Sequence, residues 1–207
     1  MANDYSPRKT DERKERITFL IVCEGQKTER IYFGKYRERN SGLIIFTPNT
    51  TVTDPINLMK FTLNQIKKYD LDFEHGDQAW CVFDADKNTN DNIDQSRLIA
   101  EINNIKCCMS IPCFELWYLL HYCYFDQKAS NLDLIKTLEK YIQNYDKTKD
   151  YFNLLFEKRN IAIDNAKKLI RKHQIEGTKL LSVKSSPSTQ VVSLVEEILK
   201  LLEQNKK

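Results

Sequence analysis

The 207-residue sequence is poor in glycine and proline, with five residues of each. Tight turns draw on these two residue types, so the composition disfavours a fold built from many short strands. The chain has ten tyrosines, ten phenylalanines and a hydrophobic share of 41%. A chain of this length buries roughly 70% of its unfolded surface when it folds. The composition therefore favours long helices around a small sheet and argues against a chain that is disordered throughout.

A large net charge is also missing, because 32 Lys and Arg residues stand against 29 Asp and Glu residues, for a formal charge of +3. Overall charge therefore gives no sign of nucleic-acid binding, which would have to come from local patches. The longest apolar runs, such as Phe19–Cys23 and Ile111–Phe114, fall far short of the roughly 20 residues that span a bilayer. The first residues are charged where a signal peptide is apolar. We expect a soluble protein that is not exported and has no membrane partner.

The cysteines lack the spacing of metal sites or redox pairs. Neither a CxxC pair nor a Cys/His zinc pattern occurs among the six, which stand in apolar runs at positions 23, 81, 107, 108, 113 and 123. This pattern is typical of buried thiols in a reducing compartment. We therefore expect a cytoplasmic protein.

The order of apolar segments predicts an α/β fold. Residues 1–16 are highly charged and form the first predicted unit, a flexible leader. Residues 17–128 alternate strand and helix signals, which predicts a parallel sheet of about four strands flanked by helices on both faces. Residues 129–207 carry helix signals only and predict an all-helical C-terminal extension packed on that domain. The predicted strands cover residues 17–23, 43–46, 78–83 and 107–110.

Helix boundaries follow from capping residues and periodicity. Asp54 before Pro55 predicts the start of a helix that runs toward Tyr69. We also expect Asp94 to cap a helix ending at Asn103 and Pro112 to open an apolar helix. The remaining predicted helices cover residues 28–39, 131–144, 150–173 and 188–204, the last with a cap near Ser188.

Acidic side chains follow two of the predicted strands. Glu24 comes directly after the first strand, and Asp84 and Asp86 come after the third. Ligands bind in the crevice at the carboxyl ends of parallel strands, and a spacing of two places both aspartates on one side of an extended chain. Aspartate after a strand is also a common turn former, and a single DxD pair has many false positives. The presence of Glu24 at the same sheet edge favours a functional site.

Three carboxylates in one crevice repel one another unless a cation neutralises them. Oxygen ligands alone select a hard ion, so we expect Mg²⁺ or Mn²⁺ held by Glu24, Asp84 and Asp86. Such sites keep positions for phosphate oxygens and serve phosphodiester chemistry. Glu115 is a fourth candidate for catalysis and metal binding, because a charged residue in an apolar segment is costly to bury. A solvent-facing residue at the start of a helix is an equal alternative for Glu115.

Further candidates have ordinary structural explanations as well. His121, one helical turn after Trp117, is a provisional catalytic residue or a structural histidine. Lys27 and Lys87 stand close to the carboxylates and can contact a phosphate or lie in solvent. The basic residues near the C-terminus lack acidic neighbours in the sequence except Glu176. They form either a phosphate-binding stripe or a solvated helix face. The candidate substrate contacts in this stripe are Lys167, Lys168, Arg171 and Lys172.

Several segments together carry a family resemblance, and they cover most of residues 17–200. The chain resembles the RloB family in Ile21–Glu29 (IVCEGQKTE), Val82–Asp86 (VFDAD), Ser110–His121 (SIPCFELWYLLH), Asn165–Lys167 (NAK) and Ser186–Thr189 (SPST). The Pro-Cys-Phe-Glu segment is the most specific of these. Ile111 stands where the family usually has asparagine, so that position offers no polar side chain.

The resemblance implies a fold and a biological setting. Members of the family resemble the Toprim fold of topoisomerases, primases and overcoming-lysogenization-defect nucleases. They are often encoded beside an AAA-type ATPase in restriction or abortive-infection loci, which implies phage defence and an ATPase partner. By the Toprim pattern, Glu24 is the acid/base or metal carboxylate, and Asp84 and Asp86 are metal ligands.

We therefore expect a metal-dependent nuclease or related phosphodiester-processing component of a bacterial antiphage system. One rival is a non-catalytic regulatory subunit of the partner ATPase that binds a nucleotide or nucleic acid. Another is a nucleic-acid sensor that uses the basic helices and needs no metal. The sequence leaves open the choice between DNA, RNA and a smaller phosphoester.

Overall fold

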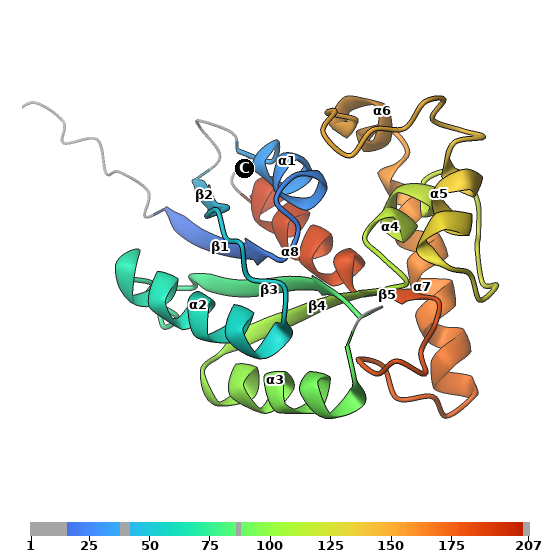
Figure 1. Ribbon diagram of the computed structural model, residues 1–207. Coiled ribbons are helices and arrows are strands. Elements are labelled where there is room, and N and C mark those ends of the chain that lie inside the picture. Colours follow the sequence, from blue (N-terminus) through green and yellow to red (C-terminus); the bar gives the residue numbers. More distant parts are fainter. Residues whose placement is uncertain (1–15, 38–41, 86–87, 205–207) are drawn as a thin grey trace, which may run out of the picture.

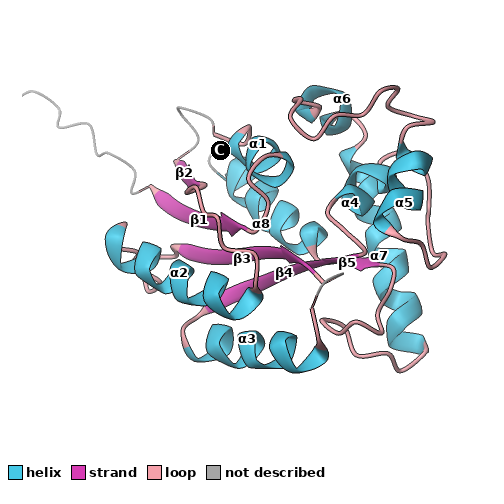
Figure 2. Cartoon of the chain, viewed as in Figure 1, coloured by secondary structure: helices cyan, strands magenta, loops and turns pink. Residues whose placement is uncertain are grey.

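A five-stranded sheet lies at the centre of the protein (Figures 1 and 2). The computed structural model describes residues 16–37, 42–85 and 88–204. The strand order is β2-β1-β3-β4-β5, in which the first four strands are parallel and the last pairs antiparallel with β4. The strands are β1 (Ile17–Cys23), β2 (Leu43–Phe46), β3 (Gln78–Asp84), β4 (Ile105–Ile111) and β5 (Ser188–Thr189).

Eight helices surround the sheet in the part of the chain that the structure describes. They are α1 (Thr28–Gly34), α2 (Pro55–Lys68), α3 (Asn90–Ile102), α4 (Glu115–Leu120), α5 (Asn131–Leu138), α6 (Phe152–Phe156), α7 (Arg159–Ile175) and α8 (Val191–Gln204). The α/β class and the four parallel strands are confirmed. None of these helices is long and apolar enough to cross a membrane.

Residues of β1 alternate between two cores. Phe19, Ile21 and Cys23 face the core formed with α1, α4, α7 and α8, whereas Leu20 and Val22 face the core formed with α2 and α3. All five side chains are fully buried. A strand buried on both faces reads as a continuous apolar run, as β1 does in the sequence.

The predicted helix starts at Asp94 and Pro112 are wrong. Helix α3 begins at Asn90, because the Thr89 hydroxyl accepts a hydrogen bond from Asn92 N at 3.2 Å, so Asp94 lies inside the helix. Pro112 does not open a helix: β4 continues to Ile111 and α4 begins only at Glu115. The predicted start of α2 is confirmed, since the Asp54 side chain accepts from Asn57 N at 2.9 Å.

The C-terminal region is not all helical. Ser188 lies in β5 and pairs with Ile111, while Thr189 pairs with Ser110, so the last helix begins later than predicted, at Val191. The predicted helix 150–173 is two helices, α6 and α7, and α5 ends at Leu138 instead of residue 144. Extended pairing with β4 accounts for β5, because a two-residue strand has no periodicity that a sequence pattern can detect.

The cysteines have the expected state. All six are free thiols, with Cys107 and Cys123 half-buried and the other four buried. Burial raises the pKa of Cys23 and Cys81 well above the ordinary value. Both thiols therefore stay protonated and unreactive at neutral pH. The predicted leader lies almost entirely outside the described residues.

The packing of α8 predicts that the C-terminal region contributes to the free energy of unfolding of the domain. Ile198 is fully buried against the sheet, whereas Ile102 on α3 is 81% exposed. We expect Ile198→Ala to lower the free energy of unfolding by about 2 to 5 kcal/mol, because it leaves a cavity in the core. Ile102→Ala is the matched control and should change it by less than about 0.5 kcal/mol. Equal effects of the two substitutions in urea titrations would contradict this packing.

Candidate active-site crevice

The connections of β1 create a crevice at the carboxyl edge of the sheet. From β1 the chain passes through α1 to β2 on one side, and then through α2 to β3 on the other side. Helix α1, which follows β1, and helix α3, which follows β3, belong to the cores on opposite faces of the sheet (Figure 1). The loops after β1 and β3 therefore diverge, which is the topological switch point where ligands bind in such sheets.

The structure places a pocket of about 280 Å³ at this point. Its lining combines four carboxylates with two amines. These are Glu24, Glu29, Asp84 and Glu115, and Lys27 and Lys147. The structure thus brings together three of the predicted carboxylates and one of the predicted lysines. Asp86 and Lys87 lie outside the described residues.

Glu24 and Asp84 are joined across the gap between their strands. The Glu24 Oε2 atom accepts a hydrogen bond from the backbone N–H of Asp84 at 3.1 Å, and Glu24 N donates to Val82 O at 2.8 Å. Both side chains are half-buried. This link between adjacent strand ends fixes the Glu24 carboxylate at the mouth of the crevice.

Glu29 is the acidic residue of the site that the sequence interpretation missed as a candidate. It lies in the first turn of α1 and is 7% exposed. Its carboxyl group packs against Gly25, where any β-carbon would overlap it, so glycine is needed for this close approach. The available signal was its place in a helix start immediately after the loop that carries Glu24.

Burial changes the acidity of Glu29. Burial raises the pKa of this carboxyl most, and the Glu115 and Glu24 carboxylates raise it too. A backbone hydrogen bond and the Lys147 amine lower it, and the net result is a rise from 4.5 to about 7. Both forms of Glu29 are therefore populated at neutral pH. A group in this range can accept or donate a proton during catalysis.

Glu115 is not the solvent-facing residue of the alternative interpretation. It begins α4 but is only 1% exposed. Its Oε1 atom accepts a hydrogen bond from the Tyr145 hydroxyl at 3.0 Å and forms an ion pair with Lys147 Nζ at 3.0 Å. Charge pairing and hydrogen bonding together allow a carboxylate to be buried.

Lys147 reaches the crevice from the segment between α5 and α6. The Thr28 hydroxyl donates to Lys147 O at 3.3 Å, which ties this segment to the start of α1. Partial burial lowers the pKa of Lys147, but the Glu115 carboxylate outweighs this effect and the pKa lies above its ordinary value. The side chain is 55% exposed and stays positively charged. A charged amine at this position can contact a phosphate.

The side chains that line the crevice can be compared with the ligands that the expected metal ion needs. Among the residues that the structure describes, no three His, Cys, Asp or Glu side chains are grouped closely enough to hold a metal ion. The site nevertheless offers only oxygen donors from its acidic residues, which match the preference of Mg²⁺ or Mn²⁺. Glu115 is engaged by Lys147 and Tyr145, and the raised pKa of Glu29 keeps that carboxyl partly protonated. Among the described residues, the carboxylates that suit an ion are therefore those of Glu24 and Asp84.

His121 lies in the core and does not line the crevice. Its Nδ1–H donates to the carbonyl of Trp117 at 2.8 Å, and burial lowers its pKa to about 4. The ring is therefore neutral at physiological pH. This environment is that of a structural histidine.

The basic residues of α7 are not nearly unopposed, as the sequence suggested. Lys167 pairs with Glu196 at 2.5 Å, and Lys172 pairs with Asp126 at 3.1 Å. The Lys168 amine lies 4.2 Å from the centre of the Tyr124 ring. Carboxylates from α8 and from the segment after α4 supply the missing charges, and sequence distance hides both. Arg171 is exposed, and none of the four basic residues lines the crevice.

The raised pKa of Glu29 predicts how stability depends on pH. The folded state binds a proton at Glu29 more tightly than the unfolded state, so this contribution is complete below about pH 4.5 and is lost as pH rises to about 7. At about 1.4 kcal/mol per pKa unit, the wild type should lose about 3 kcal/mol relative to Glu29→Gln across this range. Urea unfolding in EDTA from pH 4.5 to 8 measures the difference, with the exposed Glu139→Gln as control. Parallel curves for wild type and Glu29→Gln would show that Glu29 titrates normally.

Comparison with known proteins identifies the family. The sequence model of one family, described as RloB-like protein, matches residues 19–198. No curated protein and no solved structure matches the chain. Since the family match covers most of the sequence, including every described residue of the crevice, the chain belongs to the RloB-like family.

Proposed function

We propose that the chain is a metal-dependent nuclease, or a related phosphodiester-processing component, of a bacterial antiphage system. The observation that carries this proposal is the link between Glu24 and Asp84 at the switch point of the parallel sheet. Acidic residues after adjacent parallel strands are the arrangement that the Toprim resemblance implies. An AAA-type ATPase encoded nearby is the partner that the family resemblance suggests.

The proposed ion is Mg²⁺ or Mn²⁺, with Glu24, Asp84 and Asp86 as its ligands. A divalent cation at these oxygens supplies electrostatic stabilisation of the charge on a scissile phosphate. Repulsion between the carboxylates is reduced when such an ion binds, which favours occupancy. The hydrogen bond from Asp84 N keeps the Glu24 carboxylate oriented before the ion arrives.

Glu29 is the residue that we assign to proton transfer. It lines the crevice, it is buried, and its pKa of about 7 matches the working pH of a general acid or base. At its carboxyl oxygen it can take a proton from attacking water or return one to the leaving oxygen. Glu24 remains the second candidate for this role, as the Toprim pattern implies.

Lys147 is the residue that we assign to holding the substrate phosphate. Its ion pair with Glu115 Oε1, an atom that also accepts a hydrogen bond from the Tyr145 hydroxyl, fixes the position of the amine. Glu115 is therefore a positioning residue and not a metal ligand in this scheme. The Lys147 amine, like that of Lys27, lines a crevice of carboxylates, where it can orient an anionic substrate.

The alternative is a non-catalytic regulatory subunit, in which the charged Lys147 amine of the crevice would hold an anionic ligand without chemistry. A subunit of this kind would bind a nucleotide or nucleic acid in the crevice and regulate the ATPase. Substitution of the carboxylates would then change complex formation or ATP turnover, and no strand would be cut.

The nuclease proposal predicts metal-dependent cleavage that needs Asp84. Labelled single- and double-stranded DNA and RNA would be incubated with the protein in Mg²⁺, Mn²⁺ or EDTA, with and without the partner ATPase. We expect Asp84→Asn to reduce cleavage roughly 100- to 1000-fold, since metal stabilisation is worth several kcal/mol. Asp164→Asn, at an exposed position on α7, is the matched control. Full metal-dependent cleavage by Asp84→Asn would refute the assignment.

The Lys147 proposal predicts a change in substrate binding more than in turnover. We expect Lys147→Gln to raise KM about tenfold with a small change in kcat, because a held phosphate contact is worth about 1.4 kcal/mol. Lys147→Arg should restore part of the loss. Glu115→Gln should act in the same direction, and the double variant should be less impaired than the sum of the two, since both remove one interaction. An unchanged KM with a lower kcat would place Lys147 in a different role.

A further inference from the structure

The backbone of Asp84 is held on both sides by groups from three different parts of the chain. Its N–H donates to Glu24 Oε2 at 3.1 Å, and its carbonyl accepts a hydrogen bond from the side-chain amide of Asn88 at 2.8 Å. The next N–H, that of Ala85, donates to Ser110 O of β4 at 3.0 Å. The peptide groups on both sides of the Asp84 side chain therefore have fixed positions, which set the direction in which that side chain leaves the strand.

Asn88 is the residue of this arrangement that belongs neither to the sheet nor to the lining of the crevice. It is half-buried, and its own N–H donates to Ala85 O at 3.1 Å, so it contacts the end of β3 through main chain and side chain. A carbonyl at the end of a strand still needs a hydrogen-bond donor, and asparagine is a residue type whose side chain bonds nearby backbone groups. Asn88 therefore completes the hydrogen bonding of Asp84.

The start of α3, directly after Asn88 and Thr89, is anchored by the loop from residue 176 to 187. Val183 N donates to Asn90 Oδ1 at 3.0 Å. Lys179 Nζ forms an ion pair with Asp94 Oδ1 at 2.7 Å. Both acceptors lie in the first half of α3, so this end of the helix is attached to the C-terminal region as well as to the sheet.

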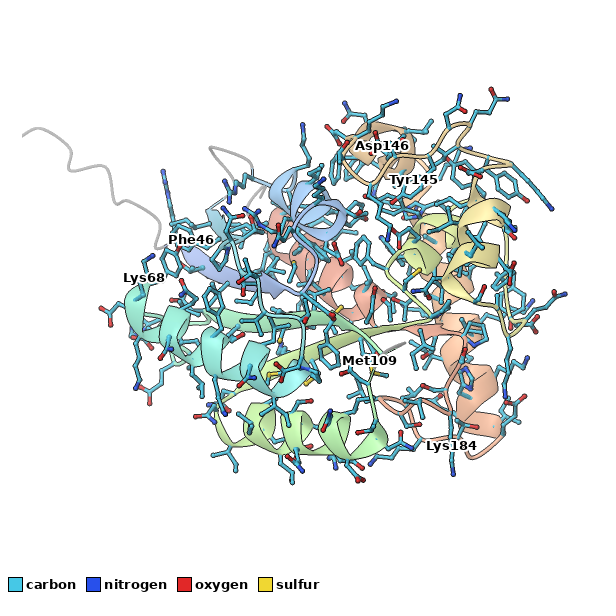
Figure 3. The ribbon with its side chains drawn as sticks, viewed as in Figure 1. Phe46, Lys68, Met109, Tyr145, Asp146 and Lys184 are labelled. Atoms are coloured by element: carbon cyan, nitrogen blue, oxygen red, sulfur yellow. The ribbon has the colours of Figure 1, made fainter. Side chains whose placement is uncertain are left out.

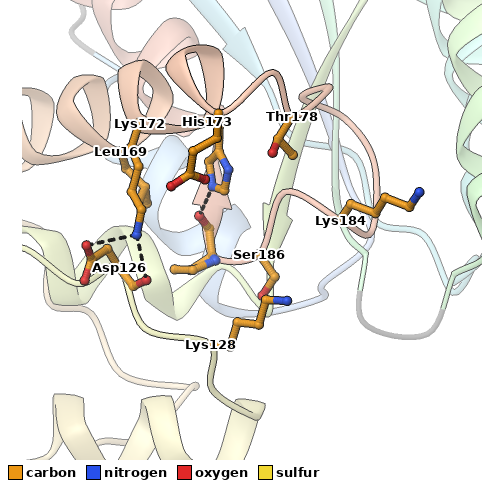
Figure 4. A pocket seen from close by; sticks show the side chains of 10 residues that line it. Asp126, Lys128, Leu169, Lys172, His173, Thr178, Lys184 and Ser186 are labelled. Atoms are coloured by element: carbon orange, nitrogen blue, oxygen red, sulfur yellow. Dashed lines mark hydrogen bonds and ion pairs between the residues drawn. The ribbon is translucent and has the colours of Figure 1, made fainter.

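The far end of the same loop is attached to α7. His173 Nε2–H donates to the carbonyl of Pro187 at 2.7 Å, as Figure 4 shows. Within the loop, the buried Ser185 hydroxyl donates to Ser182 O at 2.8 Å. Figure 3 shows Lys184 of this loop on the side of the molecule where α3 begins. The support of α3 therefore has a defined structure of its own, which keeps the neighbouring Asn88 in place.

We propose that Asn88 is a positioning residue for the divalent cation of the crevice. By holding the Asp84 carbonyl, it fixes the orientation of the Asp84 carboxylate and raises the affinity of the site for the ion. Residues that orient a ligand without touching the metal commonly contribute roughly 10- to 100-fold to metal affinity. The inference rests on the proposed function, because it takes Glu24 and Asp84 as ligands of the ion.

Asn103 offers a matched control at the other end of α3. Its side-chain amide donates to Ile99 O at 2.8 Å, which is the same kind of hydrogen bond at the same distance, and both asparagines are half-buried. The 13 residues of α3 lie between the two asparagines and span about 20 Å. Asn88→Ala and Asn103→Ala should therefore show similar losses of stability in urea titrations, because each removes one such hydrogen bond.

Electron paramagnetic resonance of Mn²⁺ without nucleic acid measures the affinity of the site independently of cleavage. We expect Asp84→Asn to weaken Mn²⁺ binding most, Asn88→Ala to weaken it roughly 10- to 100-fold, and Asn103→Ala to leave it unchanged. Asn88→Asp separates positioning from charge, because it adds a negative charge but replaces the N–H donor opposite the Asp84 carbonyl with an oxygen. Added charge alone would tighten binding of a cation, whereas loss of positioning weakens it.

The outcomes distinguish failure of this inference from failure of the proposed function. No Mn²⁺ binding by the wild type, or unchanged binding by Asp84→Asn, would overturn the metal site and the role of Asn88 with it. Weak binding by Asp84→Asn together with normal binding by Asn88→Ala would overturn the role of Asn88 alone. Tighter binding by Asn88→Asp, or an equal loss in Asn103→Ala, would also overturn that role.

Discussion

Strand β1 is hydrogen-bonded to β2 on one side and β3 on the other, and its side chains are buried on both faces of the sheet. This constraint governs the rest of the structure, because a strand without a wet face requires helices on both sides. The chain meets the requirement by sending α1, which follows β1, to one face and α3, which follows β3, to the other. That divergence opens the crevice directly after Cys23, where Glu24 follows. The position of the candidate site is therefore a consequence of how the central strand is buried.

Four carboxylates line the crevice, and a different interaction reduces the electrostatic repulsion at Glu24, at Glu115 and at Glu29. Glu24 receives a backbone N–H from Asp84, Glu115 is paired with Lys147, and Glu29 has a pKa high enough to hold a proton near neutral pH. Each of these interactions reduces the electrostatic repulsion among the carboxylates. These interactions account for the presence of several carboxylates in one crevice, where the described residues include no group of three potential metal ligands.

Sequence periodicity was sufficient for the central strands, because runs such as residues 17–23 are apolar throughout and have no alternative amphipathic helix pattern. It also placed Glu24 and Asp84 at one sheet edge, since parallel strands end together. It failed where tertiary pairing decides the structure: β5 exists because Ser188 and Thr189 pair with β4. Lys147 was missed for the same reason, as its partner Glu115 is distant in sequence. Glu29 was missed because its importance comes from burial, which a polar residue in a helix start does not reveal.

The contact between Glu115 and Lys147 also bears on how the chain is organised. The predicted boundary at residues 128–129 separates the α/β domain from the C-terminal region, yet Lys147 and Tyr145 from the far side of that boundary complete the crevice. Helices α7 and α8 share one core with β1 and α4, so the boundary does not divide the packing either. A buried carboxylate such as Glu115 needs its cation to be tolerated in the core. The C-terminal region is therefore part of the site's electrostatics as well as of its support, and the crevice is complete only when both parts of the chain are folded together.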